Sequence, residues 1–400
     1  AATLSRMSAR SGPATAPAVT EFPFVTTRAT EFPWTAEHCY LNNASIGPIP
    51  LRTQRAIARV ELGRREPYRF DDTGLMEILA AGRRAAAALI NADPAEIALA
   101  PNTSYGLNMA AQTLPLGNGD RVLVPDGEFP ANVYPWLLQQ ERGAVVELVP
   151  RTRDGWPDEA RLLQRLADPT VRVVAVSHVQ FATGYRIDLD RLGAACRERN
   201  VYLVVDAIQA LGQVPLDVRR TPVDLLACGA QKWLLSPWGA GFLYVRRALI
   251  PQLTPRFAGW MAFRGTDDFT RLTDYDATFH DDARRFELVT LPFQDMAGMV
   301  ESVGLLLELG VPRIAAYLRA LRAPLDARAA RGAFAFASPT DPAHDSAIWC
   351  VRPRDVAAAF SRLRAAGVTC ALREGSIRLS PHCYNTPDEI ARVAALLEGR

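Results

Sequence analysis

The sequence predicts an α/β protein: a large domain with a mainly parallel, seven-stranded type of sheet covered by helices, then a smaller α+β domain. Three observations support this expectation. At 400 residues the chain is too long for one small core, which favours two domains. From about residue 95 to 245, short β-branched runs alternate with helical stretches, as in a parallel sheet covered on both faces. Beyond about residue 290, helices and then short strands follow, as in an α+β domain.

The N-terminal part of the chain precedes this alternation. Residues 1–34 are rich in Ala, Thr, Pro and Ser with little apolar periodicity, and we predict that they form a flexible or surface-draped arm. Around Tyr40 a short apolar run enters a polar turn that ends in Gly-Pro. Helices are expected at about 51–64 and 74–91, where the apolar residues recur with helical spacing.

The alternating region contains seven strand-like runs. They lie at about 96–100, 121–124, 145–149, 171–176, 201–205, 224–226 and 242–245. Helices are expected to begin near 103 and 132 and to span about 158–167 and 189–199. In sheets of this type the ligand lies at the carboxyl ends of the strands. Polar residues just beyond those ends are therefore the candidates for a functional site.

The C-terminal part follows a loop-rich stretch at about 250–290. Its expected elements are helices at 294–309 and 312–330, a strand at 347–351, a helix at 354–366, strands at 368–372 and 376–380, and a helix at 387–398. We place the large domain at 35–265 and the small domain at 266–400, with the helices of 294–330 as the connection.

Composition excludes several classes of protein. The net charge of +2, with 22% charged residues and no basic block, does not indicate binding to nucleic acid or to a membrane surface. No stretch reaches the ~18 apolar residues of a membrane span, and no secretory signal is apparent. The six cysteines and five histidines are dispersed without metal-binding spacing. These features favour a reduced, cytoplasmic protein without a metal centre.

Lys232 is the only lysine among the 45 basic residues of the chain. An arginine-biased genome could leave one lysine by chance. A lysine, unlike an arginine, can lose its proton at accessible pH and attack a carbonyl to form a Schiff base. The surrounding pattern must distinguish the two interpretations.

Two strand-like runs end in candidate residues. Asp206 follows the run at 201–205, with Gln209 three residues later, and Ser177-His178 follows the run at 171–176. A carboxylate at the end of a buried strand needs a partner. Asp206 is either a helix N-cap or the partner of a cationic ring nitrogen. His178 is either a satisfied loop or core residue or a catalytic one.

Two further strand ends add an anion site and an aromatic ring. Thr103 and Ser104 open a helix, where they are either ordinary caps or, with the backbone amides, an anion site. Phe129 follows another strand and is either a core residue or part of the site. An anion site, an aromatic ring, an acid and the single lysine at one sheet edge together suit a cationic heterocycle with a phosphate and an aldehyde. We therefore predict pyridoxal 5′-phosphate.

The chain resembles fold-type I pyridoxal-phosphate enzymes of the class V aminotransferase group from about Tyr40 to the C-terminus. The group includes cysteine desulfurases, cystine C–S lyases and isopenicillin N epimerase-like proteins. The motifs that carry the resemblance are Leu41-Asn42-Asn43-Ala44, Asn102-Thr103-Ser104, Glu128-Phe129-Pro130-Ala131-Asn132, Ser177-His178, Asp206-Ala207-Ile208-Gln209, Gln231-Lys232-Trp233, Arg285-Phe286-Glu287, Ile377-Arg378-Leu379-Ser380 and Tyr384-Asn385-Thr386.

The resemblance implies a role for each cofactor-binding residue. Lys232 would form the Schiff base and move protons at the substrate α-carbon, and Asp206 would keep the ring nitrogen protonated. Phe129 would stack on the ring, where many relatives have histidine. His178 and Gln209 would lie near the ring 3-oxygen. The residues expected at the phosphate are Thr103, Ser104 and Gln231.

The resemblance also implies a homodimer and a site for the substrate. Thr290 would reach the phosphate across the dimer interface, although Val289 replaces the usual preceding glycine. Arg378 would bind the α-carboxylate of an amino-acid substrate through a bidentate pair, with Asn43 nearby. Beside these roles, four residues are candidates for the substrate side-chain pocket: Tyr185, Trp260, Arg373 and His382.

The sequence departs from desulfurases just before Arg378. Those enzymes carry a catalytic cysteine on a loop, whereas Cys370 lies in a strand pattern with no room for such a loop. We expect Cys370 to be buried and a desulfurase to be disfavoured. The expected activity is that of an aminotransferase or C–S β-lyase acting on an L-amino acid. An epimerase, or a protein that binds the cofactor without turnover, is the alternative.

Overall fold

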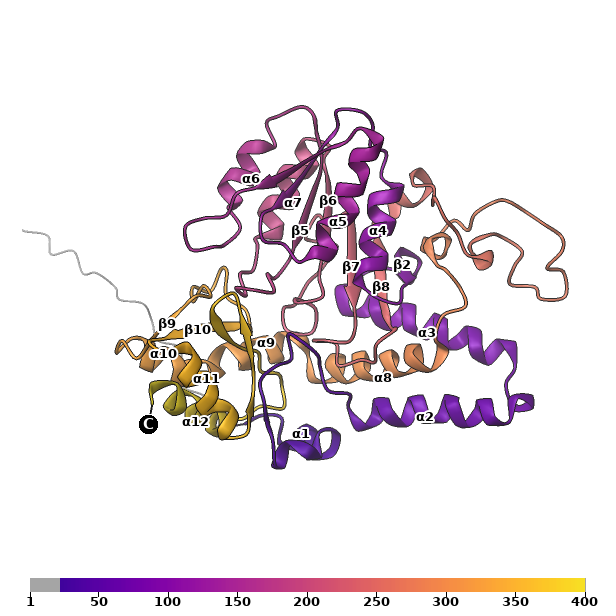
Figure 1. Ribbon diagram of the computed structural model, residues 1–400. Coiled ribbons are helices and arrows are strands. Elements are labelled where there is room, and N and C mark those ends of the chain that lie inside the picture. Colours follow the sequence, from indigo (N-terminus) through magenta and orange to yellow (C-terminus); the bar gives the residue numbers. More distant parts are fainter. Residues whose placement is uncertain (1–21, 400) are drawn as a thin grey trace, which may run out of the picture.

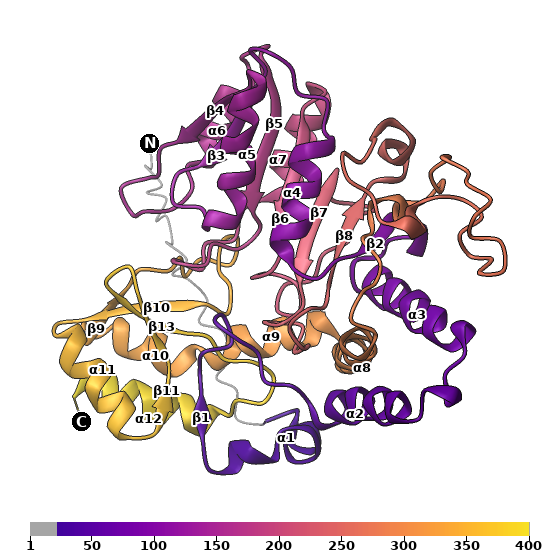
Figure 2. The ribbon, with the colours of Figure 1, turned by 45° about the vertical axis from the view of Figure 1, so that its right-hand side comes forward.

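The computed structural model describes residues 22–399. Its large domain is built on one seven-stranded sheet with the order β2-β8-β7-β6-β5-β3-β4 (Figures 1 and 2). The strands are β2 (Ile97–Leu99), β3 (Arg121–Pro125), β4 (Val145–Val149), β5 (Val171–Ser177), β6 (Tyr202–Asp206), β7 (Leu225–Gly229) and β8 (Gly241–Val245). The predicted seven-stranded, mainly parallel sheet is confirmed.

Strand β8 makes the sheet mixed, because it pairs antiparallel with both β7 and β2. The other pairs are parallel. The connection between β7 and β8 is a loop without a helix, so it can return the chain only as an antiparallel neighbour. This loop carries Lys232, and it begins at the edge where β2, β3, β5 and β6 also end.

Helices and two hydrophobic cores cover the two faces of the sheet. The helices are α4 (Thr103–Thr113), α5 (Tyr134–Leu137), α6 (Glu159–Arg165) and α7 (Leu189–Glu198). Along β6, Leu203 and Val205 belong to one core and Val204 to the other, as the alternation of a strand requires. Helix α4 packs closely on β7, because a Cβ atom at Gly106 would lie 2.7 Å from the Cβ atom of Ala227. This contact places the N-terminus of α4 beside the end of β7.

A layer of long helices lies below the sheet in Figure 1. It consists of α2 (Leu51–Arg65), α3 (Asp72–Ile90) and α8 (Phe293–Leu309), and both α2 and α3 pack against α8. The predicted helices at 51–64, 74–91 and 294–309 match these elements closely. The loop-rich stretch between β8 and α8 extends away from the sheet, to the right in Figure 1.

The small domain contains a four-stranded antiparallel sheet with the order β12-β13-β10-β9. Its elements are β9 (Phe334–Phe336), β10 (Trp349–Pro353), β12 (Ala371–Arg373), β13 (Ser376–Leu379), α9 (Val311–Leu321), α10 (Ala323–Ala329), α11 (Val356–Ala365) and α12 (Pro387–Glu398). The helix predicted at 312–330 is divided, because Pro324 starts a new helix and cannot continue the old one. Strand β9 was not predicted, since three residues are too few for a periodic signal.

The described part of the predicted flexible arm is folded. Residues 1–21 of that prediction lie outside the described residues, whereas α1 (Val25–Glu31) packs on the small domain. Phe24 is buried edge-on against Tyr317 at 5.3 Å, and Arg28 pairs with Glu389 at 2.9 Å. Residues 25–31 form a helix that lies on the small domain, as the surface-draped alternative allows, because the burial of aromatic side chains outweighs the polar composition.

Residues after α1 join the two domains. Strand β1 (Cys39–Tyr40) pairs in parallel with β11 (Val368–Thr369), and the turn that follows crosses to the large domain. The strand predicted at 368–372 is therefore divided into β11 and β12, which pair with different partners. The turn at 42–48 thus lies between the sheet edge that carries Lys232 and the strand that carries Arg378.

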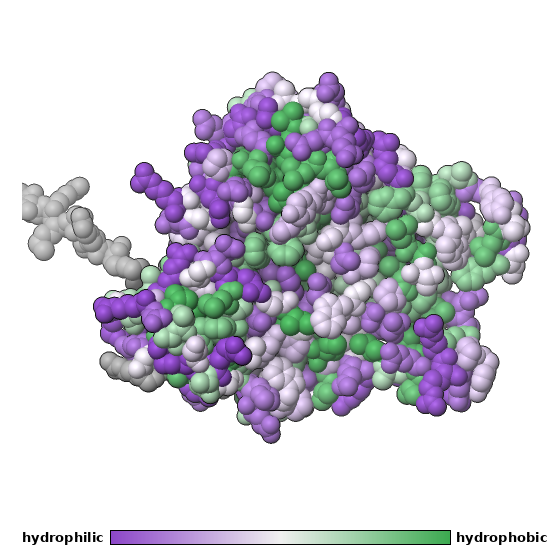
Figure 3. Space-filling model, in the orientation of Figure 1, coloured by the Kyte–Doolittle hydropathy of each residue, from purple (hydrophilic) through white to green (hydrophobic). Residues whose placement is uncertain are grey.

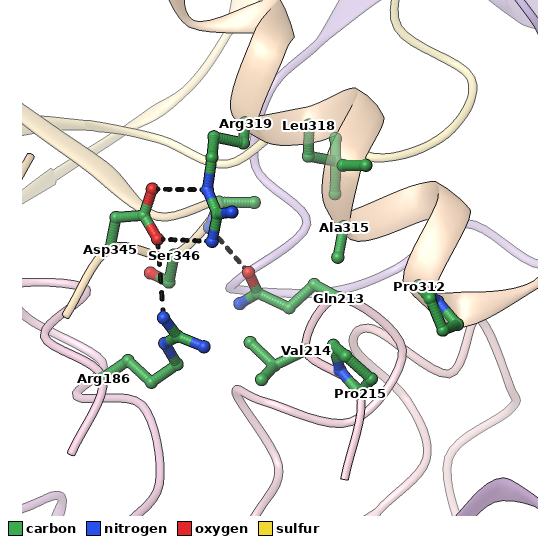
Figure 4. A pocket seen from close by; sticks show the side chains of 12 residues that line it. Arg186, Gln213, Val214, Pro215, Pro312, Ala315, Leu318, Arg319, Asp345 and Ser346 are labelled. Atoms are coloured by element: carbon green, nitrogen blue, oxygen red, sulfur yellow. Dashed lines mark hydrogen bonds and ion pairs between the residues drawn. The ribbon is translucent and has the colours of Figure 1, made fainter. Parts of the chain in front are cut away.

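Charged and polar contacts hold the small domain against the large one. Figure 4 shows Asp345 between Arg319 of α9, at 2.9 and 3.0 Å, and Arg186 of the large domain, at 3.7 Å. Gln213 of the large domain accepts a hydrogen bond from the backbone of Ala347 at 2.6 Å. These residues surround a cavity of about 210 Å³. The contacts fix the position of the small domain, and with it Arg378, relative to Lys232.

Candidate active site

Lys232 lies near the start of the loop between β7 and β8. Its Nζ atom is 5.6 Å from the centroid of the Phe129 ring. Burial, together with the charges of Arg378 and Arg373, lowers the pKa of Lys232 to about 8, although Asp206 opposes the shift. A substantial fraction of this amine is therefore neutral near physiological pH, as a nucleophile or base requires.

The turn at 42–48 packs against the backbone of Gln231 and Lys232 and is hydrogen-bonded to it. The Gly47 amide donates to the carbonyl of Gln231 at 2.9 Å, and a Cβ atom at Gly47 would lie 2.0 Å from the Lys232 carbonyl oxygen. The side-chain amide of Asn43 donates to the Lys232 carbonyl at 3.3 Å and accepts from the Tyr384 hydroxyl at 2.9 Å. Only a glycine fits position 47, and Asn43 holds the Lys232 backbone while lying beside the site.

Asp206 ends β6 next to Ser177 on β5 and is 2% exposed. Its Oδ1 atom accepts from the Ile208 amide at 3.0 Å, and no helix begins there, so the N-cap interpretation is not met. Burial raises the pKa of Asp206 to about 6, and no arginine or histidine within residues 22–399 pairs with it. A cationic ring nitrogen would supply the missing partner.

His178 and Gln209 lie at the same edge. His178 is 5% exposed, and its Nδ1 atom has no hydrogen-bond partner among the residues that the structure describes. Burial lowers the pKa of His178 to about 3, so the ring is neutral. Gln209 accepts from the Trp233 indole at 2.8 Å and donates to the Ala44 carbonyl at 3.0 Å. One amide hydrogen of Gln209 thus remains for a ligand.

The N-terminus of α4 and the end of β7 form a compact cradle. The Thr103 hydroxyl accepts from the Gly229 amide at 2.8 Å, and Asn102 caps the helix by accepting from the Tyr105 amide at 2.9 Å. A Cβ atom at Gly229 would lie 2.6 Å from Gln231 Oε1 and 3.2 Å from the Thr103 amide nitrogen. Backbone amides, a hydroxyl and a side-chain amide therefore gather at a helix N-terminus, which is an arrangement suited to phosphate.

Two residues predicted at the phosphate are solvent-exposed. Ser104 follows Thr103 in the first turn of α4, with its side chain accessible. Thr290 is exposed on the segment that leads from the 3₁₀ helix η8 (Ala283–Phe286) into α8. The role predicted for Thr290 requires a second chain, so its accessibility in one chain agrees with that expectation without testing it.

Arg378 lies on β13 and is 2% exposed. It donates to the Phe181 carbonyl at 2.8 Å and to the Ser45 hydroxyl at 2.7 Å. Within residues 22–399 its Nε atom has no partner and no carboxylate pairs with it. Burial lowers the pKa of Arg378 to about 10. A buried guanidinium without a counter-ion is a site prepared for an anion.

Three functional positions were missed or only partly predicted. Ser45 and Phe181 contact Arg378, and Glu128 accepts from the Ser177 amide at 2.8 Å and from the Gln180 side chain at 2.6 Å. Ser45 and Glu128 lie within or next to the motifs quoted above, which was the available signal. Phe181 acts through its carbonyl oxygen, and a backbone contact leaves no signal in the residue type.

The four candidates for the substrate side-chain pocket have different surroundings. His382 contacts the Trp233 carbonyl oxygen at 3.0 Å through Nε2, and it is fully buried. Tyr185 stacks on a histidine and donates to Glu159 at 3.0 Å. Trp260 lines a separate cavity in the loop-rich stretch, and Arg373 is exposed. Of these four, Arg373 affects the site through its charge.

The thiol of Cys370 is poorly suited to nucleophilic chemistry. Burial and the neighbouring Cys39 raise the pKa of Cys370 to about 12. A thiolate is the reactive form of cysteine, and almost none forms at neutral pH with this pKa. Cys370 is half-buried, less than the sequence predicted, and its raised pKa argues against the persulfide-forming role of a desulfurase.

The residues fit pyridoxal 5′-phosphate as a set. A buried amine that can be neutral, a buried acid with no arginine or histidine partner within residues 22–399, an aromatic ring and a helix N-terminus lie at one edge of the sheet. Each can meet one part of the cofactor: its aldehyde, its ring nitrogen, its ring face and its phosphate.

Comparison with known proteins places the chain in a family. A model of the family "Aminotransferase class-V" matches residues 72–393. The chain is 31% identical over 304 residues to the uncharacterized aminotransferase YcbU of Bacillus subtilis, covering 76% of this chain and 79% of that protein. It is 28% identical over 402 residues to a probable cysteine desulfurase of Methanothermobacter thermautotrophicus, with coverage of 92% and 96%.

A solved structure has the same fold. The cystine C–S lyase C-DES, in complex with its product cysteine persulfide, superposes with a TM-score of 0.81 at 23% identity, covering 92% of this chain and 99% of that chain. The expected resemblance, fold and cofactor are confirmed, since the family depends on pyridoxal 5′-phosphate. The chain belongs to the class V aminotransferase family and is a pyridoxal-phosphate-dependent enzyme.

Proposed function

We propose that the protein acts at the α-carbon of an L-amino acid, as an aminotransferase or a C–S β-lyase. The observation that carries this proposal is Arg378, a buried guanidinium whose Nε atom has no partner within residues 22–399. Its charge acts on Lys232, so the two groups belong to one site. An amino acid offers a carboxylate to the first residue and an α-proton to the second.

The cofactor would be held by residues of the sheet edge. When bound, pyridoxal 5′-phosphate supplies an aldehyde that condenses with amines and a cationic ring that withdraws electrons from the α-carbon. Asp206 would face the ring nitrogen and Phe129 the ring. The other predicted contacts are Thr103, Ser104 and Gln231 at the phosphate, with His178 and Gln209 near the ring oxygen.

Lys232 and Arg378 would divide the work on the substrate. Arg378 can present adjacent N–H groups to a carboxylate, which fixes the orientation of the amino acid. Asn43 would act indirectly, by holding the carbonyl of Lys232. The neutral amine of Lys232 can take the α-proton, and its lowered pKa keeps that amine available.

The fate of the substrate after proton removal separates the candidate activities. Delivery of a proton away from the α-carbon would lead to transamination, loss of a β-substituent would lead to elimination, and return of a proton to the opposite face of the α-carbon would lead to epimerisation. A relative named as an aminotransferase and a solved C–S lyase of the same fold support the first two. Two isopenicillin N epimerases, of Streptomyces clavuligerus and Amycolatopsis lactamdurans, match over only 55% of this chain, and epimerisation stays the alternative. A protein that binds the cofactor without turnover would need neither Arg378 nor Lys232.

A panel of L-amino acids and cysteine conjugates would test the proposal. Pyruvate with a free thiol indicates a β-lyase, an oxo acid with aminated cofactor indicates an aminotransferase, and exchange of the α-proton with both configurations indicates an epimerase. The Lys232→Ala variant, which lacks the base, is the control for uncatalysed reaction. Exchange of no α-proton from any member of the panel would contradict the proposed function.

Cofactor attachment to the apoprotein should depend on pH through the titration of Lys232. Burial lowers the pKa of Lys232 to about 8. The fraction of Lys232 in the neutral form therefore decreases as the pH falls below about 8, and nearly all of the amine is neutral well above that pH. We expect the attachment rate to rise roughly tenfold per pH unit up to about 8 and then level. Stopped-flow absorbance between pH 6 and 10 measures this rate. A flat profile would contradict the prediction.

We infer a homodimer in which Thr290 serves the partner's cofactor. Thr290 is exposed, and the neighbouring stretch projects from the body with apolar residues visible at the right of Figure 3. Light scattering should give twice the mass of one chain. Hybrids of a Lys232→Ala chain with a Thr290→Ala chain should contain one intact site and one doubly altered site. Equal cofactor affinity at both sites of the hybrid would contradict this arrangement.

The compartment is also a proposal. Within residues 22–399 no helix is long and apolar enough to cross a membrane. All six cysteines are free. Free thiols are typical of a reducing compartment, which supports a cytoplasmic location.

A further inference from the structure

Glu128 is a buried carboxylate that binds one segment through three hydrogen bonds. It follows β3, is 6% exposed, and accepts from the Ser177 amide at 2.8 Å, the Ser177 hydroxyl, and Gln180 Nε2 at 2.6 Å. No arginine, lysine or histidine among the described residues forms an ion pair with it. Burial, with a contribution from the charge of Asp206, raises the pKa of Glu128 to about 7. A carboxylate in this position is costly, and hydrogen bonds alone offset the cost.

The two segments that Glu128 joins lead to different parts of the site. The ring centroid of Phe129, the next residue, lies 5.6 Å from Nζ of Lys232. On the other segment, Phe181 offers its carbonyl oxygen to Arg378 at 2.8 Å. The rings of Phe129 and Phe181 meet edge-on at 5.3 Å. Glu128 is therefore adjacent to Phe129, which would face the cofactor ring, and is hydrogen-bonded to the segment whose Phe181 carbonyl contacts Arg378.

We propose that Glu128 is a positioning residue that couples cofactor binding to substrate binding, by fixing Phe129 and the Phe181 carbonyl relative to each other. This inference rests on the proposed roles of Phe129 and Arg378. Removal of the carboxylate frees the segment at 177–181 from the one that carries Phe129. Arg378 then loses the fixed acceptor for one of its nitrogens, while the aromatic face loses its support.

A double-mutant cycle tests this coupling with L-alanine as the probe, because it carries the α-amino and α-carboxylate groups with a minimal side chain. The variants are Glu128→Ala, Arg378→Ala and the double variant. We expect Glu128→Ala to raise the Kd for pyridoxal 5′-phosphate, measured on apoprotein, and the Kd for L-alanine, each roughly tenfold. In the Arg378→Ala background its effect on L-alanine should vanish, while its effect on the cofactor should persist.

Glu96→Ala is the matched control. Glu96 is 1% exposed, accepts from the amides of Asp93 and Arg247 at 2.9 Å each, and pairs with Arg219 at 2.9 Å, and none of these contacts involves either segment. It should lower the melting temperature without changing either Kd. Glu128→Gln, which retains one acceptor oxygen, should recover much of both affinities, and the same cycle can be run with it if Glu128→Ala does not fold.

Three outcomes would overturn the inference. The first is that Glu128→Ala weakens L-alanine binding as much in the Arg378→Ala background as in the wild type. The second is that Glu96→Ala raises both Kd values as much as Glu128→Ala does. The third is that Glu128→Ala changes neither Kd. Failure of the proposed function is distinguishable, because Arg378→Ala alone would then leave L-alanine binding unchanged. The cofactor arm of the cycle would still report on the support of Phe129.

Discussion

Replacing Lys232 with alanine is expected to abolish covalent attachment of the cofactor and to lower kcat by at least roughly 10³-fold. No other lysine exists in the chain to replace it. The buried setting lowers the pKa of Lys232 to about 8, which makes this amine available as both nucleophile and base. Borohydride trapping followed by mass spectrometry of the peptides measures attachment, and the amino-acid panel measures turnover.

Lys232→Arg is the control for charge and bulk. It keeps a cation beside Asp206 but can neither condense with an aldehyde nor accept a proton near neutral pH. We expect this variant to retain non-covalent cofactor binding while remaining as inactive as Lys232→Ala. Trapped cofactor on any other residue, or turnover within tenfold of the wild type, would remove Lys232 from its proposed role.

Replacing Arg378 with alanine is expected to lower kcat/KM by roughly 10²-fold, which corresponds to the loss of about 3 kcal/mol of interaction with a buried carboxylate. Most of the change should appear in KM, since Arg378 orients the substrate while Lys232 moves the proton. Arg378→Lys should lie between the two, because an ammonium keeps the charge but loses the planar fork. Steady-state kinetics on the best substrate of the panel, with cofactor saturating, measure these effects.

Arg285→Ala separates substrate binding from folding. Arg285 is also a buried arginine, 8% exposed, that donates to backbone carbonyls, at 2.8 Å to both His280 and Ile250. Its removal should reduce the melting temperature and leave KM unchanged. If Arg378→Ala and Arg285→Ala have the same effect on KM, Arg378 does not bind the substrate carboxylate.

Local signals in the sequence were enough for much of the large domain. The alternation of apolar runs with helices predicted all seven strands, and the strand ends predicted where Lys232, Asp206 and Thr103 would lie. These predictions succeed because a strand buried on both faces needs a continuous apolar run, and its end is marked where polar residues begin. The single lysine was visible from counting alone.

Contacts between distant segments were beyond the reach of the sequence. The arm at 22–34 looked flexible, yet its helix gains burial against residues almost 300 positions away. Strand β8 runs antiparallel because of its short connection, which a list of strands does not reveal. Asn43, predicted beside the substrate, also holds the Lys232 carbonyl, and the hydroxyl bound to Arg378 comes from Ser45.

The sequence by itself determined the chemistry available to this protein: one amine, an acid at a strand end, an aromatic ring and a helix N-terminus. These follow from residue type and local pattern. Only the tertiary structure decided how that chemistry is assembled. Three features depend on domains, turns and backbone carbonyls that come together across the fold: the Nε of Arg378, which has no partner among residues 22–399, the approach of Phe129 to Lys232, and the hydrogen bonds of Glu128. Packing between distant segments, rather than the identity of neighbouring residues, sets these contacts.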